Sequence, residues 1–330
     1  MTTVDADPIV VADDYDVDEV ESCLGEEGES SLGSARSVLD YRHENGRTYH
    51  RYKDGKYSLP NDDEENDRLD LQHNLCLLTF DNKLGLSPPN LPGSNVQRVL
   101  DVGTGTGIWA VDFGDEHPDA EVIGIDLSPI QPTCIPPNVE FVIDDIEDDW
   151  DYLGEFDYVH SRFMNLSIQD WKGYLENIYK NLTPGGYVEL QEVDVIMGCD
   201  DGTLTEDLTL YKWCRLFDEA AENIGRSFAR TDKFKDIMTE VGFVDVVETR
   251  FKWPSNQWPK DPKYKELGAW NNENAKLALE ALTLAPFTRG LGWNREQVDD
   301  YLVDLKRDFN DPKIHAYWPI CAVYGRKPVE

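Results

Sequence analysis

The sequence has little positive charge for its length. Its 330 residues include 31 Lys and Arg against 65 Asp and Glu, a formal net charge of −34 at pH 7. Such an excess of negative charge repels nucleic-acid phosphates and anionic lipid surfaces, so we expect direct binding to neither. A basic protein partner is compatible with this charge, and so is a role in solubility alone.

Long apolar runs and paired cysteine motifs are also lacking. No apolar stretch approaches the roughly 20 residues of a membrane-spanning helix, and the acidic N-terminus resembles neither a secretory signal nor an Arg-rich transit peptide. The cysteines have no C-x-x-C spacing, and no histidine–carboxylate spacing indicates a metal site. We therefore expect reduced thiols in a cytoplasmic or nuclear protein without metal. The six cysteines are Cys23, Cys76, Cys134, Cys199, Cys214 and Cys321.

The composition divides the chain into three parts. Residues 1–34 contain no Lys or Arg and few apolar side chains, which predicts a disordered acidic tail or, alternatively, an acidic docking arm. Residues 35–95 are expected to form an N-terminal extension, and residues 96–330 the main domain with a helical insertion at about 255–315. Tyr, His and Arg are frequent in segment 41–62, which would suit a lid over a ligand or an ordinary packed extension.

A glycine turn organises the main domain. An apolar run over residues 96–102 predicts a buried strand, three glycines follow at alternate positions, and a helical pattern begins at Ile108. Strand, glycine turn and helix form the first unit of a nucleotide-binding α/β domain. A dinucleotide fingerprint would need glycine at position 108, where this chain has Ile108. The turn is formed by Gly103, Gly105 and Gly107.

Further strands are predicted around this unit. The second, over residues 121–127, contains Asp126 about twenty positions beyond the glycines, where a carboxylate can accept both ribose hydroxyls. The other predicted strands cover residues 139–144, 156–162, 187–194, 243–253 and 320–326. Helices are expected at 68–84, 170–181, 204–224, 232–241, 263–284 and 294–310, with a turn at 285–293 between the last two.

These motifs resemble the S-adenosylmethionine site of class I methyltransferases. The resemblance rests on Asp-x-Gly-x-Gly-x-Gly from Asp101, followed by Gly-Ile-Asp ending at Asp126. It implies that an acidic residue after the third strand, Asp145, receives the adenine amino group. The alternative is a Rossmann-like domain for another nucleotide, such as an oxidoreductase, against which Ile108 counts. The implied cofactor-binding residues are Asp101, Gly103, Thr104, Gly105, Gly107, Asp126, Leu127, Asp145, Ile146 and His160.

Segments on both sides of these motifs are similar to fungal LaeA-like methyltransferases. The similarity lies in Tyr-His-Arg-Tyr at 49–52, Arg-Leu-Asp-Leu-x-His at 68–73, and His-Ala-Tyr-Trp-Pro at 315–319. It implies a Rossmann-like, seven-stranded, mostly parallel sheet with helices on both faces and an antiparallel last strand. It also implies either methyl transfer to a small molecule in secondary metabolism or a regulator of that metabolism acting through protein partners.

The candidate catalytic side chains are few. His160 and Arg162 end the fourth predicted strand and would face the cofactor crevice. His50 could serve as a base if the N-terminal segment folds over that crevice, since histidine titrates near neutral pH. Methyl transfer from a sulfonium mainly requires alignment and exclusion of water, so a base is optional. Trp213, Phe217 and the Trp-rich span 253–270 would suit either an apolar acceptor pocket or plain core.

Overall fold

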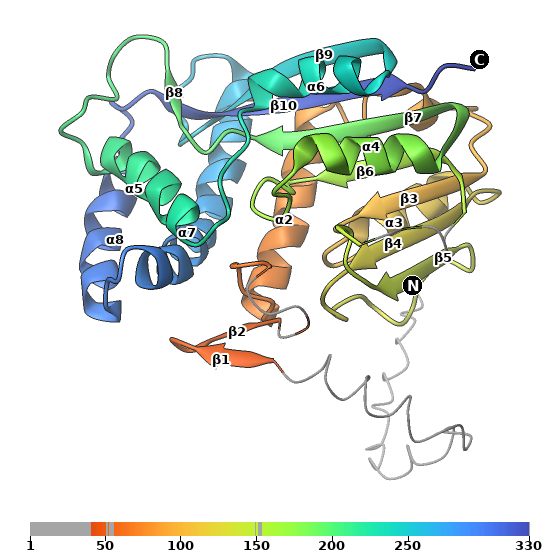
Figure 1. The fold of residues 1–330 in the computed structure, drawn as a ribbon. Coiled ribbons are helices and arrows are strands. Elements are labelled where there is room, and N and C mark those ends of the chain that lie inside the picture. Colours follow the sequence, from red (N-terminus) through yellow and green to blue (C-terminus); the bar gives the residue numbers. More distant parts are fainter. Residues whose placement is uncertain (1–40, 51, 53–55, 149, 151–153, 330) are drawn as a thin grey trace, which may run out of the picture.

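The computed structural model describes residues 41–50, 52, 56–148, 150 and 154–329. The predicted acidic tail, residues 1–34, lies outside them. The main sheet has eight strands in the order β5-β4-β3-β6-β7-β10-β8, and β9 pairs with the free side of β10 (Figure 1). The strands are β3 (Arg98–Val102), β4 (Glu121–Asp126), β5 (Val139–Ile143), β6 (Phe156–Arg162), β7 (Leu182–Val193), β8 (Gly198–Cys199), β9 (Val244–Pro254) and β10 (Ala316–Arg326).

The sheet confirms the predicted class I architecture. Strands β3 to β7 run parallel, while β10 runs antiparallel to β7, β8 and β9. Seven long strands were expected, and the two-residue β8 is an addition beside the start of β10. Strand β7 begins at Leu182, five residues earlier than predicted, because Leu182 pairs with Phe156 before a register shift.

Helices cover both faces of the sheet and extend beyond one end of it. Helix α3 (Ile108–Glu116) follows the glycine turn, and α4 (Trp171–Asn181) packs with α6 (Phe234–Val241). Helices α5 (Thr209–Asn223), α7 (Pro262–Gly290) and α8 (Arg295–Asn310) gather into a separate layer (Figure 1). Helix α2 (Asp63–Thr79) contacts α7 on one side and α3 on the other. Two short 3-10 turns occupy Pro88–Asn90 and Thr231–Lys233.

The prediction of a turn at residues 285–293 is wrong for residues 285–290, which are helical. Helix α7 continues through Pro286 to Gly290 although proline removes a helical hydrogen bond. Burial overrides this local cost, because Ala285 and Phe287 are fully buried in the core. Gly290 lies so close to α5 that a Cβ there would be 2.4 Å from the Ala220 carbonyl oxygen.

Part of the N-terminal extension, residues 56–61, lies across the carboxyl ends of the parallel strands β3, β4, β5 and β6. The extension begins, in its described part, with a short hairpin, β1 (Arg42–Glu44) and β2 (Arg47–Tyr49). Arg47 forms a bidentate ion pair with Asp62, at 2.6 and 2.7 Å, and Asp62 caps α2 by accepting from the Glu65 backbone. These contacts fix the hairpin against the start of α2. Within the described part of the chain, every helix is too short or too polar to traverse a lipid bilayer.

Candidate functional site

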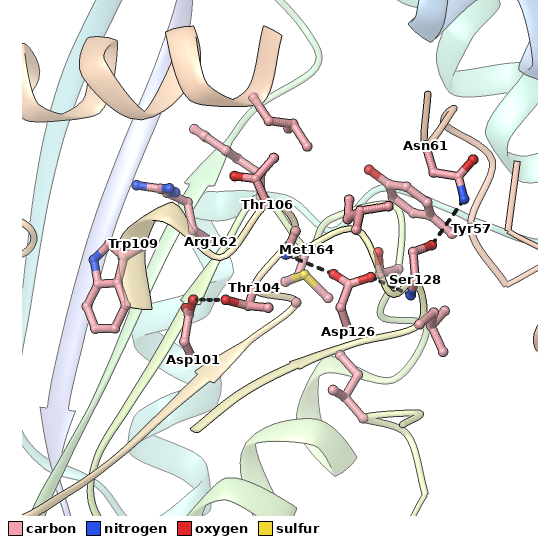
Figure 2. A pocket seen from close by; sticks show the side chains of 18 of the residues that line it. Tyr57, Asn61, Asp101, Thr104, Thr106, Trp109, Asp126, Ser128, Arg162 and Met164 are labelled. Carbon is pink, nitrogen blue, oxygen red and sulfur yellow. Dashed lines mark hydrogen bonds between the residues drawn. The ribbon is translucent and has the colours of Figure 1, made fainter. Parts of the chain in front are cut away.

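A cavity of about 130 Å³ opens at the carboxyl ends of β3, β4 and β6, where parallel sheets bind ligands (Figure 2). Most residues predicted for the site line it, whereas Gly107 and His50 do not. Segment 56–61 of the extension supplies one wall. The predicted residues in the lining are Asp101, Gly103, Thr104, Gly105, Asp126, Leu127, Asp145, Ile146, His160 and Arg162.

The glycine turn needs its glycines for two different reasons. All three have positive φ, between 57° and 80°, which side chains disfavour. A Cβ on Gly103 would lie 2.2 Å from the Met164 sulfur, and one on Gly107 would lie 2.4 Å from the Phe141 ring. Gly107 therefore lets α3 start against β5. Gly105 has more room and presents its backbone to the cavity.

Asp126 lies across the turn from Asp101. Its carboxylate accepts hydrogen bonds from the backbone amides of Gly105 and Ser128, both at 2.9 Å (Figure 2). Each oxygen keeps a second lone pair for a ligand. Burial raises the pKa of Asp126 to about 6, because the partly paired carboxylate loses water. A ligand hydroxyl donating to this carboxylate would meet an acceptor that the protein holds in place.

Asp101 is held by two side chains. Its two oxygens contact His160 Nδ1 at 2.7 Å and accept from the Thr104 hydroxyl at 2.6 Å. The His160 ring stacks on Trp109 at 3.8 Å with an interplanar angle of 4°. His160 is 1% exposed, and its Nε2 has no hydrogen-bond partner among the described residues. The geometry orients His160 toward Asp101, so we assign it to positioning this carboxylate.

Arg162 is held in place by a chain of hydrogen bonds, here called a relay, that the sequence did not predict. Arg162 donates to His73 Nδ1 at 3.2 Å, and His73 Nε2 contacts Asp112 at 2.9 Å. A guanidinium only donates, so His73 accepts on Nδ1 and carries its proton on Nε2. Burial lowers the pKa of His73, which favours this neutral form. The relay joins α2, α3 and β6, and no local spacing could have revealed it.

Asp145 is engaged by the N-terminal extension. Its carboxylate pairs with Lys56 and also accepts from the Glu147 backbone at 3.0 Å. Lys56 lies 3.2 Å from the Glu147 carboxylate as well. The extension is further attached through Asn61, which donates to the Ser128 hydroxyl at 3.4 Å (Figure 2). These contacts close the cavity on the side of Asp126 and Asp145.

His50 shapes the extension from outside the cavity. Its ring nitrogens face the backbone carbonyl oxygens of Tyr52 and Tyr57 at 2.7 and 3.2 Å. Both nitrogens are therefore occupied by the backbone of the segment that carries Lys56 and Tyr57. The structure does not bring His50 to the predicted crevice, and it points to a scaffold role for this side chain.

A second cavity, of about 120 Å³, adjoins the first. The two cavities share Tyr57, Leu69, Gln72 and Phe163 as lining residues. The second is mostly apolar and lies among the sheet, α2, α5 and α7. Of the tryptophans in the predicted acceptor region, Trp258 and Trp270 do not line it. Its aromatic walls are Trp213, Phe217, Phe228, Trp253 and Trp318.

Phe163 lies at the junction of the two cavities, and hydrogen bonds to neighbouring residues hold its backbone in an unusual conformation. Its φ is +55°, unusual for a bulky residue. Its amide donates to the Gln191 carbonyl at 2.9 Å, and the next amide, of Met164, donates to Glu192 at 2.7 Å. Glu192 is fully buried and lines neither cavity. Through its bond to the Met164 amide, Glu192 supports the backbone beside Phe163. Burial raises the pKa of Glu192 to about 8.

The strand order, the glycine turn and the two carboxylates flanking it define a class I methyltransferase. A family model described as a methyltransferase domain matches residues 68–248, more than half of the chain. The chain belongs to this family, in the fungal group that includes LaeA-like proteins.

Curated relatives match along nearly the whole chain. "Methyltransferase pytC" of Aspergillus terreus is 40% identical over 91% of this chain and 91% of its own length. "Secondary metabolism regulator LAE1" of Cochliobolus heterostrophus is 38% identical over 86% and 94%. "Probable methyltransferase tdiE" of Emericella nidulans is 36% identical over 89% and 91%. The relatives thus carry both enzymatic and regulatory names.

Proposed function

We propose that this methyltransferase takes its methyl group from S-adenosylmethionine and transfers it to a small molecule of fungal secondary metabolism. The observation that carries the donor assignment is the pairing of Asp101 and Asp126 on either side of the open backbone at Gly105. The names of the relatives support the metabolic setting. The second, apolar cavity supports a small acceptor.

The first cavity offers a fitting group for each part of the donor. Asp126 would accept the ribose hydroxyls, and Asp145 with Ile146 would meet the adenine. Asp101, held by His160 and Thr104, would accept from the amino group of the methionine portion. Arg162 would pair with its carboxylate, because guanidinium and carboxylate form the strongest charge-assisted hydrogen bonds. Asp101 and Arg162 are therefore assigned to the two ends of one amino-acid group.

The chain's own contribution to the reaction is alignment and exclusion of water. The bound donor supplies a methyl group that its sulfonium charge already activates. Tyr57 and Phe163, which line both cavities, would hold the acceptor atom in line at the junction. Segment 56–61 covers the first cavity and would keep water out. No described side chain has to act as a base for this to proceed.

To test methyl transfer, the full chain is incubated with S-adenosylmethionine that carries a labelled methyl group and with extracts of a fungus that produces secondary metabolites. Labelled product of low molecular mass is expected, and it should disappear with Asp101→Asn, which removes the charged acceptor. Label found only on protein, with none in small molecules, would contradict the proposed acceptor class.

A regulatory role through protein partners is the second candidate. It is favoured by the LAE1 relative and by the net charge of −34, which suits a basic partner. The same labelling experiment separates the two functions, because a regulator of this kind would bind the donor without methylating extract metabolites.

A further inference from the structure

The second cavity has walls that suit a flat molecule. Trp213 and Trp253 donate their indole N–H groups to Thr283 and Thr79, at 2.8 and 2.7 Å, so they offer the cavity apolar ring surface. Trp213 stacks on Phe217 at 5.2 Å, and Phe163 meets Trp253 edge-on at 5.7 Å. Such a wall favours the face or edge of an aromatic ligand.

The charged groups in this wall cancel each other. Arg68 donates to both oxygens of Glu65, at 2.9 and 2.7 Å, and the two side chains are 5% and 1% exposed. A cationic ligand would find no carboxylate free of its partner here, and an anionic ligand would meet a guanidinium already neutralised by Glu65. Burying an unpaired charge is costly, so both kinds of ligand are disfavoured.

Hydrogen-bond donors remain in excess. The third bond of Arg68 goes to the Asn274 side-chain oxygen at 2.9 Å, which leaves two of its five N–H groups without a partner among the described residues. Asn274 is 2% exposed and lines the cavity, and its amide NH₂ likewise donates to no described residue. The wall therefore calls for a ligand that brings an acceptor, such as a carbonyl oxygen.

We propose that the second cavity binds an uncharged, planar aromatic acceptor whose carbonyl oxygen accepts hydrogen bonds from Asn274 and Arg68. This rests on the proposed function, because the same molecule presents its methylated atom at Tyr57 and Phe163. The ring packs against the walls formed by Trp213 and Trp253. Asn274 and Arg68 favour a carbonyl acceptor, and the neutralised Arg68–Glu65 pair disfavours charged analogues.

The test uses calorimetry on the full chain saturated with S-adenosylhomocysteine. Three probes share one ring system: a hydroxyacetonaphthone, the corresponding hydroxynaphthoate anion, and an aminoethyl-naphthol cation. The neutral ketone should bind at least about tenfold more tightly than either charged probe. Asn274→Leu should reduce ketone affinity by about tenfold, the cost of one lost hydrogen bond. Asn272→Leu, on the same helix but outside the cavity, is the matched control.

Asn274→Asp provides a second variant that keeps the size of the side chain. It should weaken ketone binding and improve binding of the aminoethyl probe. The inference is overturned if the charged probes match the ketone, if no probe binds, or if both Asn274 variants bind the ketone as tightly as the unmodified chain does. S-adenosylhomocysteine binding is titrated separately on each protein. If the unmodified chain does not bind S-adenosylhomocysteine, the proposed function is contradicted. If it binds S-adenosylhomocysteine but does not prefer the neutral ketone, only this inference is contradicted.

Discussion

Lys56 of the N-terminal extension forms an ion pair with Asp145, a residue 89 positions later that follows β5. The pair joins a segment outside the main domain to the carboxylate assigned to the adenine. Asp145 is almost completely buried while Lys56 is partly exposed, so the contact covers the cavity rather than the surface around it. Residues 56–61, which we call the strap, therefore lie across the proposed donor site.

We predict that ligand binding tightens this strap. Hydrogen exchange of backbone amides in residues 56–61 should slow on addition of S-adenosylhomocysteine, because a ligand between Asp126 and the strap adds contacts to both. Exchange in β10, remote from the cavity, serves as the internal control. If exchange in 56–61 is the same with and without ligand, the segment is a fixed part of the scaffold and not a lid.

Asp126 should control donor affinity and its pH dependence. Asp126→Ala should cost about 1.5–3 kcal/mol of binding free energy for S-adenosylhomocysteine, the value of hydrogen bonds to a charged acceptor. Because the pKa of Asp126 is about 6, the affinity of the unmodified chain should fall as pH drops through 6 and the carboxylate gains a proton. The variant should lack that step.

The matched control for this prediction is Asp119→Ala, an exposed carboxylate beyond α3. It should bind the ligand as the unmodified chain does, with the same loss of affinity below pH 6. An Asp126→Ala protein that melts normally and keeps full affinity would remove Asp126 from the site.

Arg162 should recognise the amino-acid end of the donor. Arg162→Met is expected to weaken S-adenosylhomocysteine by about 1.5–3 kcal/mol, since a charge-assisted pair is lost. Binding of 5′-methylthioadenosine, which lacks the carboxylate, should not change. Calorimetry with both ligands checks this, and equal losses for the two would show that Arg162 supports the cavity without contacting the carboxylate.

Glu192 should make stability depend on pH. Its folded-state pKa of about 8 lies above the ordinary value of 4.5, so its stabilising contribution is full below pH 4.5 and is lost as pH rises to 8. Glu192→Gln keeps an acceptor for the Met164 amide and removes the titration. Denaturant unfolding at pH 8 should find this variant more stable than the unmodified chain by at least about 1 kcal/mol. A variant that loses stability equally at pH 5 and pH 8 would contradict a protonated Glu192.

Secondary structure could be predicted from the sequence wherever residues close together in the chain determine it. The strand ending at Val102, the glycine turn and Asp126 could be predicted because strand, turn and helix signals lie within about 30 residues. The extent of α7 could not, because burial of Ala285 and Phe287 outweighs the local signal of Pro286.

The parts of the site that were missed depend on contacts between distant segments. His73 appeared in a family motif, but its place between Asp112 and Arg162 requires the packing of α2 on α3. The pairing of Lys56 with Asp145 and the position of Asn274 beside Arg68 likewise join residues far apart in the chain. Periodicity and spacing do not encode such pairs.

The central claim is that the first cavity is built for S-adenosylmethionine and not for a dinucleotide. Calorimetry of the full chain against S-adenosylhomocysteine and against NAD, under identical conditions, tests it most directly. The account predicts saturable binding of S-adenosylhomocysteine and at least about tenfold weaker binding of NAD, because Ile108 replaces the last glycine that a dinucleotide fingerprint requires. Tighter binding of NAD than of S-adenosylhomocysteine would contradict it.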